Sequence, residues 1–110
     1  MDNVKDDRYY LDKLMDDLTI ITRRMAGVTE AAFDANDLLQ DAMMFRLIQV
    51  SENAGKLSEA FKAARPHVPW NAVYGLRNRI VHDYGAVDLH IVYSTLSEDI
   101  PALKAHLQPE

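Results

Sequence analysis

The chain has 110 residues, and 48% of them are hydrophobic, which is enough for one domain with a single core over residues 1–110. No cysteine occurs, so disulfides and thiolate metal sites are excluded and a reducing compartment, the cytoplasm, is expected. A net charge of −5 argues against a protein that coats nucleic acid through a broad basic surface. The first residues lack a basic region followed by an apolar run, and no stretch of about 18 apolar residues occurs, so we expect neither export by that route nor a membrane span.

The first helix is predicted to begin near Asp6 or Asp7, whose carboxylates suit the positive end of the helix dipole. Its apolar residues recur at steps of three and four, which places them on one face of a helix. They are Leu11, Leu14, Leu18, Ile21 and Met25. Gly27 is expected to end this helix in a left-handed conformation.

The second helix follows a loop or short helical turn over residues 28–35, and either Asp34 or Asn36 could cap it. The pattern predicts that it runs to about Ala64 and is the longest element. Its apolar stripe is Met43, Leu47, Val50, Ala54, Leu57 and Phe61. Gly55 inside it costs about 1 kcal/mol relative to alanine, which close packing against a neighbouring helix could offset. Glu52 lies near the edge of the stripe. The pattern is equally consistent with a carboxylate that faces solvent or an interface and with one that supports a functional site.

Two prolines, Pro66 and Pro69, then break the pattern, and Pro69 suits the first turn of a third helix. This helix is predicted to end at Gly85, with one ridge formed by Trp70, Val73, Arg77, Ile80 and Tyr84. Asp88 should cap a fourth helix that Pro101 kinks or restarts. Its stripe is Leu89, Val92, Leu96, Ile100, Leu103 and Leu107. Four helices with short connections predict an all-α, up-and-down bundle.

Neither a metal site nor a cofactor site is predicted from the sequence. The five methionines read as core fillers. His67, His90 and His106 have no carboxylate partner at metal-ligand spacing, so surface or structural roles are expected for them. The glycines do not form a phosphate-binding loop.

The stretch from Arg77 to Tyr84 combines two cations, an imidazole and a phenol in an otherwise ordinary helical sequence. Arg77 and His82 are five residues apart, so they lie about 140° apart around a helix. Either the helix unwinds near His82, or a second copy of the chain supplies the complementary pair across a two-fold axis. Asn78 and His82 are i, i+4 neighbours, so the amide can hold the imidazole in one tautomer.

An arginine and a histidine without a carboxylate pair suit attack on a phosphodiester. His82 could accept the proton of an RNA 2′-hydroxyl, and the Arg77 guanidinium could stabilise the charge on the phosphoryl oxygens. The products would be a 2′,3′-cyclic phosphate and a 5′-hydroxyl. The alternative is structural: Arg77 and Arg79 pair with acidic residues, His82 satisfies helix carbonyls and Tyr84 packs in the core. Composition and spacing alone favour this alternative.

The segment Arg77-Asn78-Arg79-Ile80-Val81-His82 resembles the signature of the HEPN superfamily, and Asp83-Tyr84 extends it to the longer Arg-x4-His-x-Tyr form. From Tyr10 onward the chain resembles HepT-like toxins. The other segments that carry this resemblance are Glu52, Pro69-Trp70, Tyr84-Gly85-Ala86-Val87-Asp88 and Ile100-Pro101-Ala102-Leu103.

This resemblance implies a HEPN-like bundle that forms a two-fold homodimer and acts as a metal-independent ribonuclease toxin. Arg77 and His82 would be catalytic, and Asn78 would orient the imidazole. Glu52 would support the site, while Arg79 and Lys56 are candidate RNA contacts. The implied partner is an antitoxin, a minimal nucleotidyltransferase of the MNT type, which would transfer AMP to Tyr84. Ser51 departs from the family, because many relatives have glycine immediately before the glutamate.

Two alternatives remain open from the sequence. The chain could be a catalytically inactive HEPN module that binds RNA or a nucleotide in the same basic region. It could also be an interaction protein whose main role is to serve as the partner subunit of the nucleotidyltransferase.

Overall fold

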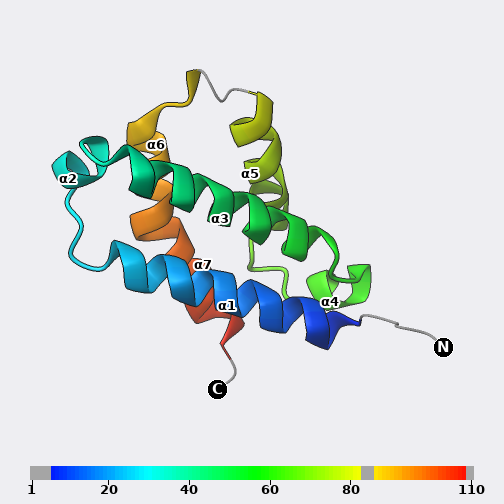
Figure 1. Ribbon diagram of the computed structural model, residues 1–110. Helices are drawn as coiled ribbons and strands as arrows, with labels where there is room; N and C mark the ends of the chain where they lie inside the picture. The colour runs from blue at the N-terminus through cyan, green and yellow to red at the C-terminus, as the bar shows by residue number, and fades with distance from the viewer. Residues whose placement is uncertain (1–5, 83–85, 109–110) are drawn as a thin grey trace.

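The computed structural model describes residues 6–82 and 86–108, and at positions 81 and 82 it describes the backbone alone. Within these ranges the chain forms helices joined by turns and short loops, and no strand occurs in them. Four helical rods account for most of the described chain, with two short helices at the connections (Figure 1). The prediction of an all-α helical bundle is therefore confirmed.

The first rod is α1 (Asp7–Met25), and its boundaries agree with the predicted ones. The Asp6 carboxylate caps it by accepting a hydrogen bond from the backbone N–H of Tyr9 at 3.1 Å. After its last residue, Gly27 adopts the left-handed conformation with φ of 76°. Leu14, Leu18 and Ile21 of α1 are fully buried, as the apolar stripe predicted.

The second rod is shorter than predicted. A five-residue helix, α2 (Glu30–Asp34), precedes it, and α3 (Asp37–Gly55) is capped by the side chain of Asn36. The predicted continuation to Ala64 is wrong, because α3 ends at Gly55 and a separate helix, α4 (Glu59–Ala63), follows. At 19 residues α3 equals α1, so the prediction that it is the longest element is also wrong.

The turn between α3 and α4 is bound to the start of α1. The Ser58 hydroxyl caps α4 by accepting the N–H of Phe61. The Asp7 carboxylate accepts hydrogen bonds from the backbone N–H of Ser58 at 2.8 Å and from its hydroxyl at 2.6 Å. These bonds join residues 51 positions apart, so they are not visible in the local pattern on which the prediction rested.

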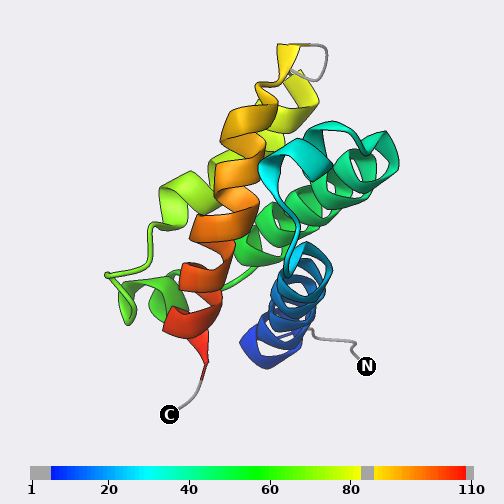
Figure 2. The ribbon, with the colours of Figure 1, turned by 90° about the vertical axis from the view of Figure 1, so that its left-hand side faces the viewer.

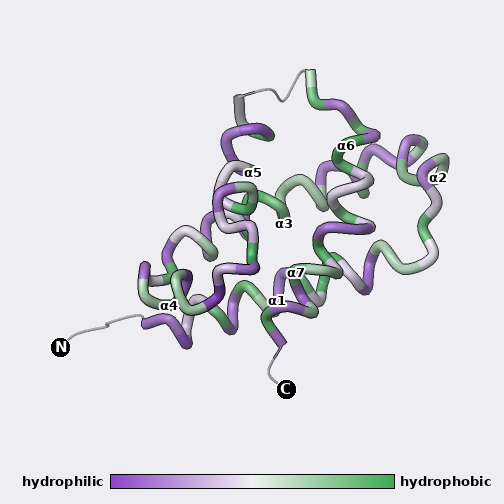
Figure 3. Tube along the Cα trace, turned by 180° about the vertical axis from the view of Figure 1, so that it is seen from behind, coloured by the Kyte–Doolittle hydropathy of each residue, from purple (hydrophilic) through white to green (hydrophobic). Residues whose placement is uncertain are grey.

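The third rod, α5 (Trp70–His82), packs on α3 and follows Pro69 as predicted. Val73 and Ile80 on its predicted ridge are buried. The predicted end at Gly85 lies outside the described residues. In Figure 3 the upper part of α5 is coloured hydrophilic, at the end that carries Arg77 to Arg79.

The last rod is a continuous column of α6 (Leu89–Ser94), the π-helical segment η2 (Thr95–Asp99) and α7 (Ile100–Leu107) (Figure 2). The Asp88 carboxylate caps α6 by accepting the N–H of His90 at 2.9 Å, which confirms the predicted cap. Pro101 lies in the first turn of α7, directly after the widened π turn. Because proline lacks the N–H needed for the regular helical ladder, this position agrees with the predicted restart.

The core lies where α3 crosses between α1 on one side and α5 on the other, with the α6–α7 column behind them (Figure 1). Its fully buried larger side chains include Phe33 of α2, Met43 and Leu47 of α3, and Leu96 of η2. No helix in the described ranges combines the length and the apolar character needed to cross a membrane.

Candidate functional site

The candidate site begins at the seam between α3 and α5. The buried Ser51 hydroxyl donates a hydrogen bond to the backbone carbonyl of Tyr74 at 2.7 Å. One turn further along α3, a Cβ added to Gly55 would lie 3.1 Å from the Tyr74 ring. The predicted close packing at Gly55 is therefore confirmed, although this glycine is the last residue of α3 rather than an interior one. Ser51 thus ties α5 to α3 beneath the site.

The same seam joins two of the predicted site residues. The Oε2 atom of Glu52 lies 2.8 Å from the Nε atom of Arg77, and each side chain is 45% exposed. The carboxylate uses only the inner nitrogen of the guanidinium. Across residues 6–82 and 86–108, the two terminal nitrogens of Arg77 have no other polar partner. They remain available as a pair of hydrogen-bond donors on a partly open surface.

The other members of the motif are distributed around α5. Asn78 and Arg79 are exposed. Because α5 is helical as far as His82, positions 77 and 82 are separated by about 140° around its axis. The side chain of His82 lies outside the described part of the structure, so its predicted contact with Asn78 stays a prediction. Tyr84 also lies outside the described residues.

Arg79 lies on a different side of α5 from the Glu52–Arg77 pair. It lines two cavities between α5 and the α6–α7 column, with volumes of about 200 and 340 Å³. Their other lining residues are mostly apolar, and Leu76 also contributes to both. No carboxylate forms an ion pair with Arg79 in the described part of the chain. The structural alternative requires both Arg77 and Arg79 to pair with acidic residues. Among the described residues such a pair is found for Arg77 and not for Arg79.

Lys56 caps the C-terminal end of α3, one turn beyond Glu52. Its ammonium lies 5.7 Å from the centre of the Tyr10 ring on α1, at a distance typical of a cation–π contact. The side chain is thus directed toward α1 in this structure, and it is not brought to Arg77. Its exposure still allows an electrostatic contribution at the surface.

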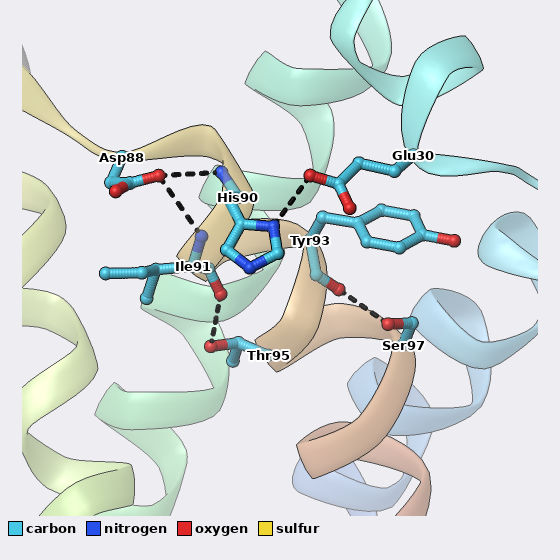
Figure 4. A network of polar contacts seen from close by, with 7 residues as sticks. All are labelled: Glu30, Asp88, His90, Ile91, Tyr93, Thr95 and Ser97. Carbon is cyan, nitrogen blue, oxygen red and sulfur yellow. Dashed lines mark hydrogen bonds and ion pairs between the residues drawn. The ribbon is translucent and has the colours of Figure 1, made fainter.

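Histidine contacts away from this seam show what the sequence could not reveal. His90 Nδ1 lies 2.7 Å from Glu30 Oε2, as Figure 4 shows, a carboxylate 60 positions away that the local spacing in the sequence could not indicate. The hydrogen bond and the charge of Glu30 raise the pKa of His90 above its ordinary value. His67 and His106 pack edge to face with ring centres 5.0 Å apart. All three are exposed side chains, in agreement with their predicted surface or structural roles.

No cluster of three or more histidine or acidic side chains suited to a metal ion is found among the described residues. The polar group that the structure does assemble is a guanidinium held by a carboxylate at one nitrogen and open at two others. Such a group can bind a phosphate through two parallel hydrogen bonds, and it can stabilise charge that develops on phosphoryl oxygens.

Comparison with protein families places these residues in context. The family model described as "HepT-like: Ribonuclease HepT-like" matches residues 14–109, which includes α3, α5 and the complete Arg77 to Tyr84 motif. The chain belongs to the HepT-like ribonuclease family. This membership confirms the resemblance that the motif indicated, and it accounts for a helical bundle of the HEPN kind.

Individual relatives of the HepT-like chain carry similar names. It is 25% identical over 105 residues to a candidate RNase of Caldanaerobacter subterraneus subsp. tengcongensis, covering 96% of this chain and 94% of that protein. It is 25% identical over 99 residues to a Thermococcus cleftensis protein named "Probable ribonuclease HepT", covering 90% of each. A Methanocaldococcus jannaschii protein, named as a gamma-glutamylcyclotransferase and candidate RNase, is 28% identical over 103 residues, 94% of this chain and 46% of that protein. No solved structure matches the chain significantly.

Proposed function

We propose that this HepT-like protein is a metal-independent endoribonuclease toxin of a toxin–antitoxin system, and that Arg77 and His82 are its catalytic residues. The observation that carries the proposal is the Arg77 guanidinium, half exposed and oriented by Glu52, within the motif of a ribonuclease family. Its terminal nitrogens are available for phosphate. A guanidinium with a purely structural role would more often be saturated by its partners.

In the proposed reaction His82 accepts the proton of the RNA 2′-hydroxyl as general base. The 2′-oxygen attacks the adjacent phosphorus, and the bond from phosphorus to the 5′-oxygen breaks. The 5′-oxygen leaves with the electron pair and takes up a proton. Arg77 stabilises the negative charge on the non-bridging oxygens during this exchange. The products are a 2′,3′-cyclic phosphate and a 5′-hydroxyl, and the proposed reaction requires no metal ion.

The neighbouring residues have supporting tasks in this proposal. Glu52 fixes the direction of the Arg77 guanidinium, since its carboxylate is bound at Nε. Asn78 is expected to hold the His82 imidazole in one tautomer. Arg79 and Lys56 are proposed as RNA contacts through charge, because both are exposed cations near the two ends of the α3–α5 seam.

A homodimer is part of the proposal because of the helix geometry. Positions 77 and 82 are about 140° apart on a helix that remains regular between them. One straight helix therefore does not direct both groups at one phosphate. A two-fold axis near α5 would place Arg77 of one subunit beside His82 of the other.

Control by an antitoxin completes the proposal. A minimal nucleotidyltransferase of the MNT type would transfer AMP from ATP to the hydroxyl of Tyr84, releasing pyrophosphate. The added phosphate and nucleoside would stand two residues from His82, where they would repel and block an RNA phosphate. Intact mass after incubation with that enzyme and ATP should rise by multiples of AMP, and Tyr84→Phe should show no gain. An unchanged mass of the wild-type protein would contradict the modification. Inhibition would then have to occur through formation of a complex with the antitoxin.

The nuclease is tested with a defined RNA in the presence of a chelator, followed by end-group analysis of the products. Wild type should give 2′,3′-cyclic phosphate and 5′-hydroxyl ends, whereas His82→Ala and Arg77→Ala should give none. The same variants should relieve growth arrest in cells. The nuclease proposal would be refuted if folded wild-type protein left the RNA intact and if wild type and both variants were equally harmless to cells.

One observation favours a second candidate, a noncatalytic RNA-binding module. Glu52 neutralises part of the Arg77 charge, as in an ordinary structural ion pair. In that case neither wild type nor His82→Ala would cut RNA, and both would bind it equally well. The role as a partner subunit of the nucleotidyltransferase predicts a stable complex without RNA binding.

A further inference from the structure

A second surface feature lies beside the Glu52–Arg77 pair. The segment from α4 to the start of α5 encloses an open groove of about 910 Å³, here called the α4–α5 groove. Its lining residues include Gly55 at the end of α3, Lys62 of α4, and Trp70, Asn71 and Tyr74 of α5. This groove is separate from the two cavities that Arg79 lines on the other side of α5.

Tyr74 is the most conspicuous side chain of the groove. It is 63% exposed, so most of its surface is open to solvent. Its ring rests against Gly55, where any larger residue would press on it. The ring is therefore supported from behind while much of its surface faces solvent.

Trp70 forms a fixed aromatic wall of the same groove. Its indole N–H donates a hydrogen bond to the carbonyl of Arg65 at 3.1 Å, and its ring packs edge to face on Phe61. These contacts hold the ring in one orientation. The groove thus offers aromatic surface that is already positioned before any ligand binds.

The groove lies next to the proposed catalytic seam. Along α3 and α5, the contact of Gly55 with Tyr74 is followed one turn later by the contact of Glu52 with Arg77. Tyr74 precedes Arg77 by three residues, which is about 4.5 Å along the helix axis and on a neighbouring part of its surface. A nucleotide whose phosphate contacts Arg77 could therefore place its base, or that of its neighbour, on Tyr74.

The polar residues of the groove suit a nucleotide as well. Lys62 supplies a cation, which lies 3.7 Å from Glu59, and Asn71 presents an exposed amide that can donate and accept hydrogen bonds. Proteins recognise unpaired RNA bases by stacking them on aromatic rings and by hydrogen bonds to their edges. Exposed aromatic surface, a side-chain amide and a cation next to a phosphate-binding arginine match those requirements.

We propose that the α4–α5 groove is a subsite for a single-stranded nucleotide, whose base stacks on Tyr74 next to the phosphate that Arg77 contacts. This inference rests on the proposed nuclease function for the position of the phosphate. It assigns the preference for unpaired RNA to Tyr74, a residue outside the Arg77 to Tyr84 motif. Bases held in a duplex cannot reach the ring, because their faces are occupied by stacking within the helix.

The test uses binding, so that it does not depend on cleavage. A single-stranded 2′-O-methyl oligoribonucleotide lacks the nucleophilic 2′-hydroxyl and cannot be cut by the proposed route. Its affinity is measured for wild type, Tyr74→Ala, Tyr74→Leu and Tyr74→Phe. Loss of the aromatic ring should weaken binding about tenfold or more, whereas Tyr74→Phe should restore it. Ile91→Ala, which removes an exposed apolar side chain from a cavity on the other side of α5, should bind like wild type.

Trp70 provides a second readout, since it is the only tryptophan of the chain. A base entering the groove should change its fluorescence in wild type and in Tyr74→Phe. Thermal melting of each variant establishes that it is folded at the assay temperature. A duplex of the same sequence should compete poorly with the single strand.

The possible outcomes separate this inference from the nuclease proposal. If wild type cleaves RNA and the Tyr74 variants bind and cleave like wild type, the groove inference fails and the nuclease stands. If wild type binds in a Tyr74-dependent way but never cleaves, the subsite stands and the nuclease fails. A change from dimer to monomer in Tyr74→Ala, measured by sedimentation, would show that the surface is a subunit contact and would overturn the inference. Equal affinity for duplex and single strand would also overturn it.

Discussion

Helix α3 carries an arginine–carboxylate pair on each of two sides, and the two pairs differ in almost every physical respect. Toward α1, Arg46 Nη1 lies 3.0 Å from Asp17 Oδ1, and the Asp17 side chain is only 7% exposed. The second oxygen of Asp17 accepts a hydrogen bond from Asn53 at 3.0 Å. Toward α5, the Glu52 and Arg77 side chains are both 45% exposed, and one carboxylate oxygen meets one guanidinium nitrogen.

The pair on the α1 side holds two helices together, whereas the pair on the α5 side leaves part of a guanidinium available to bind another group. Both oxygens of Asp17 are engaged, so a buried charge is satisfied and its loss would be costly. Arg77 is fixed at Nε yet keeps two donors, and water reaches it, so the pair contributes little to stability. The same two chemical groups, a guanidinium and a carboxylate, therefore stabilise the fold on one side of α3 and, in the proposed function, present a phosphate-binding group on the other.

The largest expected effect is on RNA cleavage by Arg77→Ala. Removing a donor that stabilises transition-state charge should lower the rate of cleavage by about 10²–10³-fold. The matched control is Arg46→Ala, which removes the guanidinium on the α1 side and should leave the rate per folded molecule unchanged. Rates are compared on one defined RNA at a temperature where circular dichroism shows both variants folded. Equal losses in both variants would remove the functional distinction between the pairs.

The stability of the fold should show the opposite ranking. Asp17→Ala leaves Arg46 and Asn53 without their acceptor and should lower the free energy of unfolding by about 3 kcal/mol. Glu52→Ala should cost less than about 1 kcal/mol, because its pair is half exposed and screened. Chemical denaturation of the two variants gives both values. Similar losses would mean that burial does not distinguish these pairs.

A smaller effect is expected at the hydrogen bond beneath Arg77. Ser51→Ala removes the donor to the Tyr74 carbonyl and should cost about 1 kcal/mol of stability. Cleavage should change little if the packing of α3 on α5 is retained. Ser51→Gly should cost more, because glycine also disfavours the helix interior. The comparison of the two variants by thermal melting separates the hydrogen bond from the backbone effect.

The smallest effect concerns the exposed His90–Glu30 contact, a third ion pair that joins α6 to α2. The folded-state pKa of His90 is raised above 6.5, first by the hydrogen bond to Glu30 and then by its charge. The stabilising contribution is therefore complete below 6.5 and is lost as pH rises through the raised pKa. The difference in melting temperature between wild type and His90→Gln should shrink over that window. Glu30→Gln should show the same loss, and a pH-independent difference would contradict the assignment.

The elements could be predicted where local chemistry determines them. The ends of α1, the Asp88 cap and the restart at Pro101 follow from residues within a few positions of each boundary. The contact that accompanies the early end of α3 could not be predicted, because it joins Asp7 to Ser58 across 51 positions of the chain.

The site was predictable in its residue types and less so in its partners. Arg77 and Glu52 were both singled out, but the sequence could not show that their side chains meet, since 25 positions separate them and only the packing of α5 on α3 joins them. The same limit applies to the contact of His90 with Glu30. Tyr74 was missed as well. Its signal would have been an aromatic residue one turn before Arg77 and off the apolar ridge, where burial does not explain it.

The bond between Asp7 and Ser58 has a practical consequence for experiments with this protein. Through that bond the start of α1 holds Ser58, the residue that caps α4, and the two helices lie side by side in Figure 1. Residues of α4 also line the α4–α5 groove. An affinity tag or fusion attached close to α1, or a truncation that removes Asp7, should loosen that wall of the groove and alter the proposed RNA binding without touching the motif. A tag placed after α7 avoids this interference, and assays with the two tag positions should differ for this reason alone.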